Sequence, residues 1–540
     1  MKPERILLNG TVRTQDKNRP LAGAVAIANG RILAAGESHE IKSLAGPDTE
    51  ILDLKGRLVL PGFMDSHLHY YDWAMGRRNL NLADVGSFAE FQDRLAEAAK
   101  STPAEAWILG QGWNESDWPE NRMPTRDDLD SIDPMHPVIL WRCDLHLAVA
   151  NSLALQLAGI DEHTPDPPHG VIARDASGRP TGILREHAPN LVKEVVSDPG
   201  DAIVFDAMLD GIPELHSYGM TGLCDVRLMG GIEGPPAMRS WQRIHDQGKL
   251  DLRCWTGIPG ERMDEAIALG LRTGFGDERL RLGHVKFFMD GGMGARTAWM
   301  IEPYLDAEQG MALWNLEELR DAVFRCDRAG LAVMIHAIGD RANREVISLF
   351  ENLETAHPKG PEWEAMQPAV RHRVEHLQMI RPEDIQRMAR LDLTACVQPH
   401  NMILDIRMIE TSVGDRGRYA YTYRSMLDAG LPLVMSSDSP VCDPRPLVGI
   451  QAAVSRRRPN GTPEGGWYPE QALTVDEAVR AYTLSAAEAN GVEGTLGSIT
   501  PGKHADLAVL DRDIYAIDPL EIAETPVAMT LFDGRIVHRR

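Results

Sequence analysis

His67 and His69 have the spacing of a metal chelate. They end the apolar segment LVLPGFMDSHLHY, which has the composition of a buried strand. Because alternate residues of a strand point to the same side, both imidazoles are expected to face one way. Two neutral imidazoles a few ångströms apart bind zinc or a similar ion. Taken alone, the pattern also fits ordinary surface or core histidines, so it indicates a metal site only together with further ligands.

Further ligand-type side chains stand at or near the ends of later apolar runs. His336 ends one run, His376 ends another, and Asp438 follows a third. Lys286 lies inside the apolar segment LGHVKFFMD, where a buried ammonium is costly unless it is paired or chemically changed. Each of these residues, taken singly, is more often structural. Their placement at one apolar run after another predicts a common site that binds metal and activates water.

The central part of the chain alternates apolar, β-branched runs with helix-like stretches. The strand-like runs are 219–226, 282–290, 330–340, 371–378, 393–400 and 431–440. Together with the strand before His67, this alternation predicts βαβ units and a (β/α)₈ barrel. A doubly wound open sheet is the alternative, but no G-x-G-x-x-G follows the first strand. In a barrel, the strand ends that carry the candidate ligands converge on the C-terminal face.

Both ends of the chain have the pattern of short strands broken by Gly, Pro, Asn-Gly and Asp-Gly turns. We expect residues 1–60 and 490–540 to pair into one small β-sandwich domain, because isolated short hairpins are marginal in water. Residues 61–489 would form the barrel. The stretch from about 70 to 215 is too long for one βα connection and is predicted as an insertion after the first barrel strand. We expect it to carry one further strand, at 136–146, and to cover the barrel mouth.

The composition favours a globular protein over a nucleic-acid or membrane protein. Hydrophobic residues make up 43% of the chain, and the formal net charge of −23 opposes binding to phosphate backbones. The tightest basic run, Arg456–Arg458, is expected to be a solvated loop. The cysteines are widely spread without a C-x-x-C pair, which favours reduced thiols in a cytoplasmic protein. With no signal-peptide pattern and no long apolar stretch, we expect neither secretion nor membrane contact.

Motifs that cover nearly the whole chain are GFMDSHLHY, VKFFMDGGMGARTA, IHAIGDRA, VEHLQ, SSDSP and LGSITPGKHADLAVLD. In this order they resemble the amidohydrolase superfamily, and most closely its YtcJ-like branch, which includes N-substituted formamide deformylase. The resemblance implies a distorted (β/α)₈ TIM barrel with a small β-sandwich formed from both termini. The motifs are specific for the superfamily and do not identify the substrate.

The resemblance also implies a metal centre with one or two divalent ions, Zn²⁺ being the expected one. Its ligands would be His67, His69, Lys286, His336, His376 and Asp438. In many relatives the lysine is carboxylated by CO₂ and bridges two metals, and a carbamate would make Lys286 a bidentate anion. A rival interpretation leaves Lys286 unmodified, as a substrate contact beside one metal. His284 is a further rival ligand, because it lies two residues before Lys286 and shares its strand face.

The reaction implied by the resemblance is hydrolysis of a carbon–nitrogen bond in a small molecule, with an N-substituted formamide or N-acyl amine as the expected substrate. Asp438 would take a proton from the attacking water and pass it to the leaving amine. Hydrolysis of a cyclic amide and deamination of an aminated ring would use the same metal residues and stay open. A non-catalytic barrel that binds a ligand is a weaker alternative, because a degenerate copy would be expected to lack some ligands. The oligomeric state stays open, with a homodimer as one arrangement.

Substrate contacts are expected from the insertion and from the Gly-rich loop after Lys286. The candidates are Arg142, Asp144, His146, Trp113, Asp290 and Arg296. Capping or core hydrogen bonding would explain His146 equally well. Trp113 and Trp118 could line the pocket or pack inside the insertion.

Two further points concern the neighbours of the candidate ligands. Asp290 and Arg296 could orient the site, or they could form a salt bridge that holds the Gly-rich loop. Glu375 precedes His376 in the chain and is expected to face the opposite side of the strand, so it is not predicted as a ligand.

Overall fold

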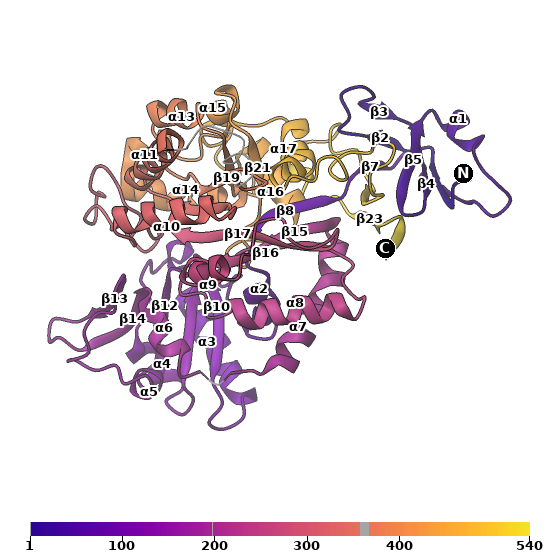
Figure 1. Cartoon of the computed structure of the whole chain (residues 1–540). Coiled ribbons are helices and arrows are strands. Elements are labelled where there is room, and N and C mark those ends of the chain that lie inside the picture. Colours follow the sequence, from indigo (N-terminus) through magenta and orange to yellow (C-terminus); the bar gives the residue numbers. More distant parts are fainter. Residues whose placement is uncertain (1, 197, 357–366) are drawn as a thin grey trace.

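The computed structural model describes residues 2–196, 198–356 and 367–540. Its centre is a nearly closed barrel of parallel strands, in the order β21-β20-β19-β18-β17-β16-β15-β8 (Figure 1). The strands are β8 (Phe63–Leu68), β15 (Met220–Asp225), β16 (Arg253–Pro259), β17 (Leu280–Phe288), β18 (Val333–Ala337), β19 (His372–His376), β20 (Leu393–Val397) and β21 (Leu433–Met435). Beyond β21, the Asp438 N–H donates to the His67 carbonyl at 2.8 Å and joins the two outer strands. The predicted (β/α)₈ barrel is confirmed.

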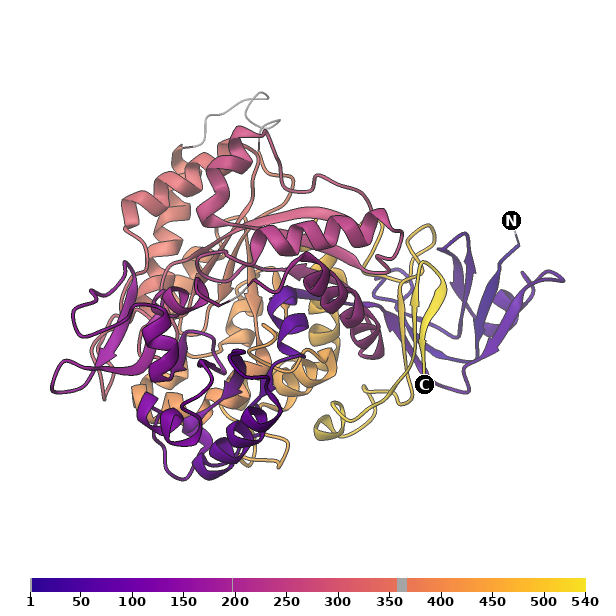
Figure 2. The same cartoon turned by 90° about the horizontal axis from the view of Figure 1, so that it is seen from below.

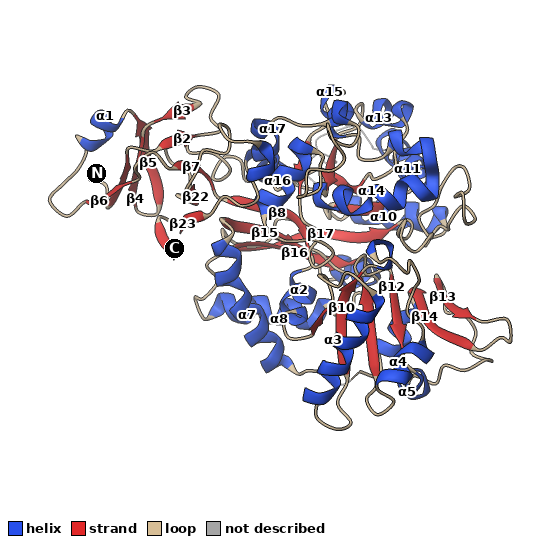
Figure 3. Ribbon diagram, turned by 180° about the vertical axis from the view of Figure 1, so that it is seen from behind, coloured by secondary structure: helices blue, strands red, loops and turns tan. Residues whose placement is uncertain are grey.

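Helices flank the barrel strands (Figure 3). The main ones are α7 (Asp201–Ser217), α8 (Gly234–Asp246), α10 (Leu316–Arg328), α11 (Asp340–Ala356), α13 (Pro382–Met388), α14 (Pro399–Val413), α16 (Pro446–Ser455) and α17 (Val475–Ala481). Helix α10 illustrates why they form. Asn315 accepts hydrogen bonds from the N–H groups of Glu317 and Glu318, and the buried residues Leu319, Ala322, Val323 and Cys326 recur at helical spacing. The apolar faces of such helices pack on the strands of the barrel. The polar residues of the site therefore lie at the strand ends.

The two ends of the chain lie side by side in one β-sandwich (Figure 2). One sheet, in the order β24-β23-β22-β7-β2-β3, mixes strands from both ends, and β22 (Leu507–Leu510) pairs antiparallel with β7 (Leu58–Pro61). Its other strands are β2 (Thr11–Arg13), β3 (Leu21–Ala22), β23 (Val527–Phe532) and β24 (Arg535–Arg539). The other sheet, in the order β5-β4-β1-β6, comes from the first part of the chain and consists of β1 (Arg5–Leu8), β4 (Ala24–Ala28), β5 (Arg31–Gly36) and β6 (Glu50–Asp53). Side chains of both sheets, including Leu7, Val25 and Leu531, form a common buried cluster. The pairing of the termini is therefore confirmed, while the domain limits at residues 60 and 490 stay a prediction.

The insertion differs from the sequence-based expectation. Instead of one further strand, it has a sheet of six strands in the order β13-β14-β12-β11-β10-β9. These are β9 (Leu80–Asn81), β10 (Ile108–Trp113), β11 (Val138–Arg142), β12 (Leu147–Ala150), β13 (Gly170–Arg174) and β14 (Pro180–Glu186). Only β11 lies in a long apolar run. The others are short or alternate buried and partly exposed residues, as β14 does, so they lack the signal of a buried strand.

Two further expectations can be compared with the structure. Within the described part of the chain, no helix is both long and apolar enough to cross a membrane. Arg456, however, is not solvated. It is fully buried, and its guanidinium donates to the carbonyls of Trp467 at 2.6 Å and Tyr421 at 3.1 Å. The expectation of a solvated loop was wrong for this residue because its guanidinium lies over the rings of Tyr423 and Trp467 and donates to backbone carbonyls.

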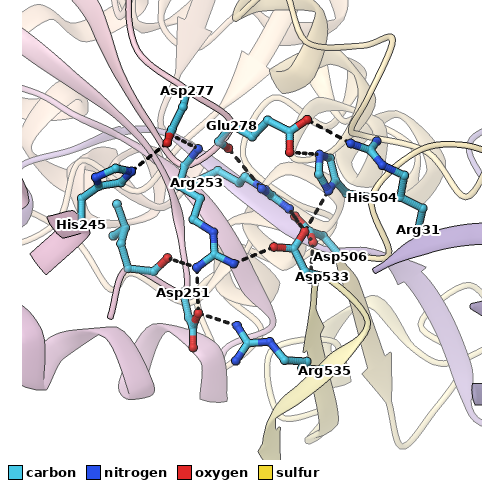
Figure 4. A network of polar contacts seen from close by, with 12 residues as sticks. Arg31, His245, Asp251, Arg253, Asp277, Glu278, His504, Asp506, Asp533 and Arg535 are labelled. Carbon is cyan, nitrogen blue, oxygen red and sulfur yellow. Dashed lines mark hydrogen bonds and ion pairs between the residues drawn. The ribbon is translucent and has the colours of Figure 1, made fainter. Parts of the chain in front are cut away.

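An ionic network joins the barrel to the β-sandwich (Figure 4). Arg253, at the start of β16, donates to both oxygens of Asp506 at 2.9 and 3.1 Å. It also pairs with Asp533, which accepts a hydrogen bond from His504 at 2.8 Å. The side chains of Arg253 and Asp506 are 2% and 4% exposed. Removal of one member would therefore leave a buried charge without its partner.

We expect Arg253→Met to lower the free energy of unfolding by about 3–5 kcal/mol, because Asp506 would lose its buried counter-charge. Urea unfolding followed by circular dichroism measures the change. The matched control is Arg31→Met at the rim of the same network, where the pair with Glu278 is 38% and 55% exposed. Such an exposed pair is worth only about 0–1 kcal/mol. Equal changes in the free energy of unfolding for Arg253→Met and Arg31→Met would contradict a special stabilising role of the buried pair.

Candidate metal centre

The six predicted ligand side chains come together at the C-terminal ends of the barrel strands. They are His67, His69, Lys286, His336, His376 and Asp438, and each is no more than 6% exposed. Asp438 Oδ1 lies 3.3 Å from Nε2 of both His67 and His69. The ring centroids of His336 and His376 are 4.4 Å apart, and those of His67 and His376 are 5.2 Å apart. The barrel thus gathers nitrogen and oxygen donors from separate strands into one place.

Hydrogen bonds fix which nitrogen faces the centre in three of the four imidazoles, those of His67, His69 and His376. His67 Nδ1 bonds to the Glu375 carboxylate, and His69 Nδ1 lies 3.2 Å from the Val226 carbonyl. His376 Nδ1 lies 2.8 Å from Gln398 Oε1. The Nε2 atoms are therefore left for a metal, as is usual when the other ring nitrogen donates to a carbonyl or carboxylate.

The ionisation states suit metal binding. Burial, with a contribution from Lys286, lowers the pKa of His67 to about 4, so its ring is neutral as ligation requires. Burial alone would raise the pKa of Asp438, but the surrounding imidazoles of His67, His69 and His376 hold it well below its usual range. Asp438 is therefore a carboxylate at neutral pH.

Lys286 lies inside the barrel beside these histidines. Its Nζ is 3.3 Å from His67 Nε2 and 4.5 Å from the centroid of the Phe288 ring. Burial lowers the pKa of the Lys286 ammonium to about 8, although nearby carboxylates oppose the shift. The rival ligand His284 lies elsewhere, because its Nε2 bonds to the Arg371 carbonyl at 3.0 Å.

These residues fit a divalent metal. The ligand atoms of His67, His69 and Asp438 all lie within 4.8 Å of one another, and all three side chains are buried. Imidazole nitrogen and carboxylate oxygen at such separations are the donors that zinc and similar ions prefer.

Glu375 was expected to face away from the ligand cluster and instead lies against it. Strand alternation predicted that it would face away from His376, yet its carboxylate contacts His67 inside the barrel. The reason is the backbone at the end of β19, where His376 has φ +72° and leaves the extended conformation. The alternation rule therefore fails at this strand end, and both side chains serve the same site.

A pocket beside the metal centre is lined by both the barrel and the insertion. His69, Lys286, His336, His376 and Asp438 form one part of its wall. The insertion supplies Trp141, Arg142, Asp144, His146 and Glu186, and α14 supplies Asn401, Leu404 and Asp405.

His146 is held in this pocket by Glu186 at the end of β14. His146 Nδ1 lies 2.8 Å from Glu186 Oε2, and Thr297 Oγ1 donates to the other oxygen. The His146 ring centroid is 5.0 Å from that of His336. A Cβ on Gly291 would lie 2.2 Å from Glu186 Oε1, which explains why the loop after β17 needs glycine there.

The comparisons with known proteins agree with this geometry. A model of the amidohydrolase family matches residues 50–538. The chain belongs to the amidohydrolase family. It is 32% identical to YtcJ of Bacillus subtilis (strain 168), over 96% of both chains, and 29% identical to N-substituted formamide deformylase of Arthrobacter pascens, over 99% and 98%. A solved structure of an uncharacterized metal-dependent hydrolase from Pyrococcus horikoshii OT3 superposes with a TM-score of 0.75 at 28% identity, covering 95% of this chain and 99% of that one.

The predicted substrate-binding residues of this amidohydrolase do not all line the pocket. Arg142, Asp144 and His146 line the pocket. Arg142 donates to Glu115 at 2.9 Å and to Asp144 at 2.6 Å, so its charge is already paired. Trp113 does not line the pocket. It is fully buried in the core of the insertion, and its Nε1 donates to the Leu140 carbonyl at 3.0 Å, which corrects the prediction of a substrate contact.

Asp290 and Arg296 also lie outside the pocket lining. Asp290 accepts backbone hydrogen bonds from Trp299, Ile338 and Gly339 at 2.7–2.9 Å, and so ties the loop after β17 to the end of β18. Arg296 pairs with Asp306 at 2.8 Å rather than with Asp290. Both residues therefore hold loops in the amidohydrolase, and neither is placed to contact substrate.

Glu186, Gln378 and Asp405 line the pocket but were missed in the sequence analysis. Gln378 donates to Asp405 Oδ2 at 2.9 Å, and the Tyr421 hydroxyl donates to the same oxygen at 2.6 Å. Gln378 lies in the VEHLQ motif, so it could have been suspected. Glu186 and Asp405 lie in a weakly patterned strand and in a helix, where no local signal marks them.

We expect the His146–Glu186 pair to stabilise this amidohydrolase more in acid than in alkali. Burial alone would lower the pKa of His146, but Glu186 outweighs burial and raises the pKa from 6.5 to about 9. The contribution is therefore fully present below about pH 6.5 and is lost as the pH rises through about 9. The melting temperatures of wild type and His146→Gln, compared from about pH 6 to 10, should converge as the pH rises. A difference in melting temperature that does not change with pH would contradict the stabilising role of the His146–Glu186 pair.

Proposed function

We propose that this amidohydrolase hydrolyses the carbon–nitrogen bond of an N-substituted formamide or N-acyl amine, using water activated by a divalent metal, with Zn²⁺ as the expected ion. The observation that carries the proposal is the convergence of His67, His69 and Asp438, with ligand atoms within 4.8 Å of one another beside a pocket. The similarity to N-substituted formamide deformylase over nearly the whole chain supports the choice of bond.

A divalent metal held by these residues would lower the pKa of a water molecule and polarise the substrate carbonyl. Asp438 is a buried carboxylate whose Oδ1 lies 3.3 Å from His67 Nε2, so it can take the proton of the attacking water. The same carboxyl group can then pass this proton to the leaving nitrogen. The products would be a carboxylate, which is formate for a formamide, and an amine.

We infer that Lys286 is carboxylated and takes part in a centre of two metals. An uncharged amine is the form that reacts with CO₂, and burial has lowered the Lys286 pKa to about 8, so part of the side chain is uncharged near neutral pH. Nζ lies 3.3 Å from His67 Nε2, so a carboxylate formed there would lie among the histidines. A carbamate would also remove a buried positive charge from beside two cations.

His146 is the best placed substrate contact in the proposal. Its Nδ1 is held by Glu186, and the ring lines the pocket beside His336. A hydrogen bond from His146 to the substrate carbonyl oxygen would add to stabilisation of the negative charge that develops there. Asp144 and Arg142 form a paired group on the same wall and would shape the pocket.

A substrate panel tests the proposal. Purified protein supplied with Zn²⁺ is incubated with N-substituted formamides, longer N-acyl amines, cyclic imides and aminated rings, and release of amine or ammonia is measured. Formate and amine in equal amounts from formamides are expected. Turnover confined to cyclic imides or aminated rings would move the function to those reactions, and metal binding without turnover of any compound would favour a binding protein.

A further inference from the structure

An ion pair lies inside the barrel next to the metal centre. Arg373 Nε donates to Glu375 Oε1 at 2.9 Å, and Arg373 Nη2 donates to Oε2 at 3.1 Å. Both side chains are 0% exposed. Arg373 Nη2 also donates to the Ser66 carbonyl at 2.6 Å, directly before His67 in the chain. The charges of Arg373 and Glu375 are therefore both removed from water, and the pair contacts the candidate metal ligand His67.

The Arg373–Glu375 ion pair by itself is expected to contribute little to the free energy of unfolding. The cost of removing two charges from water often exceeds their attraction, and well-packed apolar residues can replace such a pair without loss. The arrangement does fix the position of Glu375, because Arg373 bonds to both of its oxygens. The carboxylate is thereby held in contact with His67 Nδ1.

The three Nδ1 atoms that are held by hydrogen bonds have unequal partners. His67 bonds to a carboxylate, whereas His69 bonds to the Val226 carbonyl and His376 to the amide oxygen of Gln398. An anionic partner makes the opposite ring nitrogen more basic and orients the ring, and loss of such a partner typically costs 10–100-fold in metal affinity. His67 is therefore the strongest of the three imidazole donors.

We propose that Arg373 and Glu375 are positioning residues that make the His67–His69–Asp438 end of the centre its high-affinity metal position, with a weaker position at His336 and His376. The inference rests on the proposed function, since it assumes that the centre binds divalent metal. Arg373 acts through Glu375, and Glu375 acts through His67. Neither residue needs to touch the substrate.

The test is a Zn²⁺ titration of metal-free protein in competition with a chelating dye, with the zinc content checked by elemental analysis. Wild type is expected to bind zinc with two distinct affinities. Glu375→Gln keeps the side-chain volume and should weaken the tighter affinity by about 10–100-fold, while the weaker affinity stays unchanged. The matched control Gln398→Leu removes the neutral acceptor of His376 and should affect the weaker position alone.

Several results would overturn the inference. Equal affinities in wild type would do so without any variant, and so would an unchanged tighter affinity in Glu375→Gln. If Glu375→Gln does not fold, because Arg373 is left unpaired, the double variant Arg373→Met/Glu375→Met removes both charges and should show the same loss. If wild type binds no zinc at all, the proposed function fails first, and the two failures are thereby distinguished.

Discussion

Asp438→Asn is expected to lower kcat by about 100- to 10,000-fold, because the amide cannot take the proton of the attacking water. The carboxylate is surrounded by His67, His69 and His376, with distances of 3.3 to 3.9 Å. Asparagine keeps an oxygen at the same place, so zinc content and melting temperature should change little. Steady-state kinetics with a formamide, together with elemental analysis, measure both effects.

The control for this substitution is Asp443→Asn in the same loop. Asp443 pairs with Arg445 at 2.6 Å and is 26% exposed, so it should leave kcat within about twofold of wild type. Near-wild-type turnover in Asp438→Asn would refute the role of Asp438 as base. Loss of zinc in that variant would instead show that its main role is ligation.

Removal of metal is expected to abolish turnover, and addition of Zn²⁺ is expected to restore it. The ligand residues are at most 6% exposed, so a chelator such as dipicolinate should remove the metal slowly, over minutes to hours. The buried imidazoles of His67 and His376 stay uncharged near neutral pH, so they are free to bind the added metal. Activity and zinc content are measured together during removal and reloading.

Adding Zn²⁺ back to metal-free protein also tests whether Lys286 is carboxylated. If the lysine is carboxylated, recovery of activity should be faster and more complete with bicarbonate present, and ¹³C-labelled bicarbonate should give a carbamate signal in the NMR spectrum. Recovery that is independent of bicarbonate, with no such signal, would favour an unmodified lysine beside one metal. Full activity in verified metal-free protein would refute the metal hypothesis altogether.

Much of the barrel could be predicted because its signals are local. Each barrel strand is a short apolar run, and the polar residues that end these runs must meet at one face once the strands are parallel. This reasoning predicts one common site for His67, His336, His376 and Asp438, and the structure brings them together. It failed for the insertion, whose strands are too short and too partly exposed to stand out.

The sequence by itself determined the barrel, the pairing of the termini and the set of six side chains that includes His67 and His69, because strand periodicity and motif order record them directly. The tertiary structure alone decided the partners of those side chains. Glu375 and His376 both face the centre because His376 has a positive φ, and Glu375 contacts His67 on another strand. Glu186 and His146 reach the pocket from another sheet. Such contacts join residues far apart in the chain, and their geometry depends on backbone angles and packing that no local pattern contains.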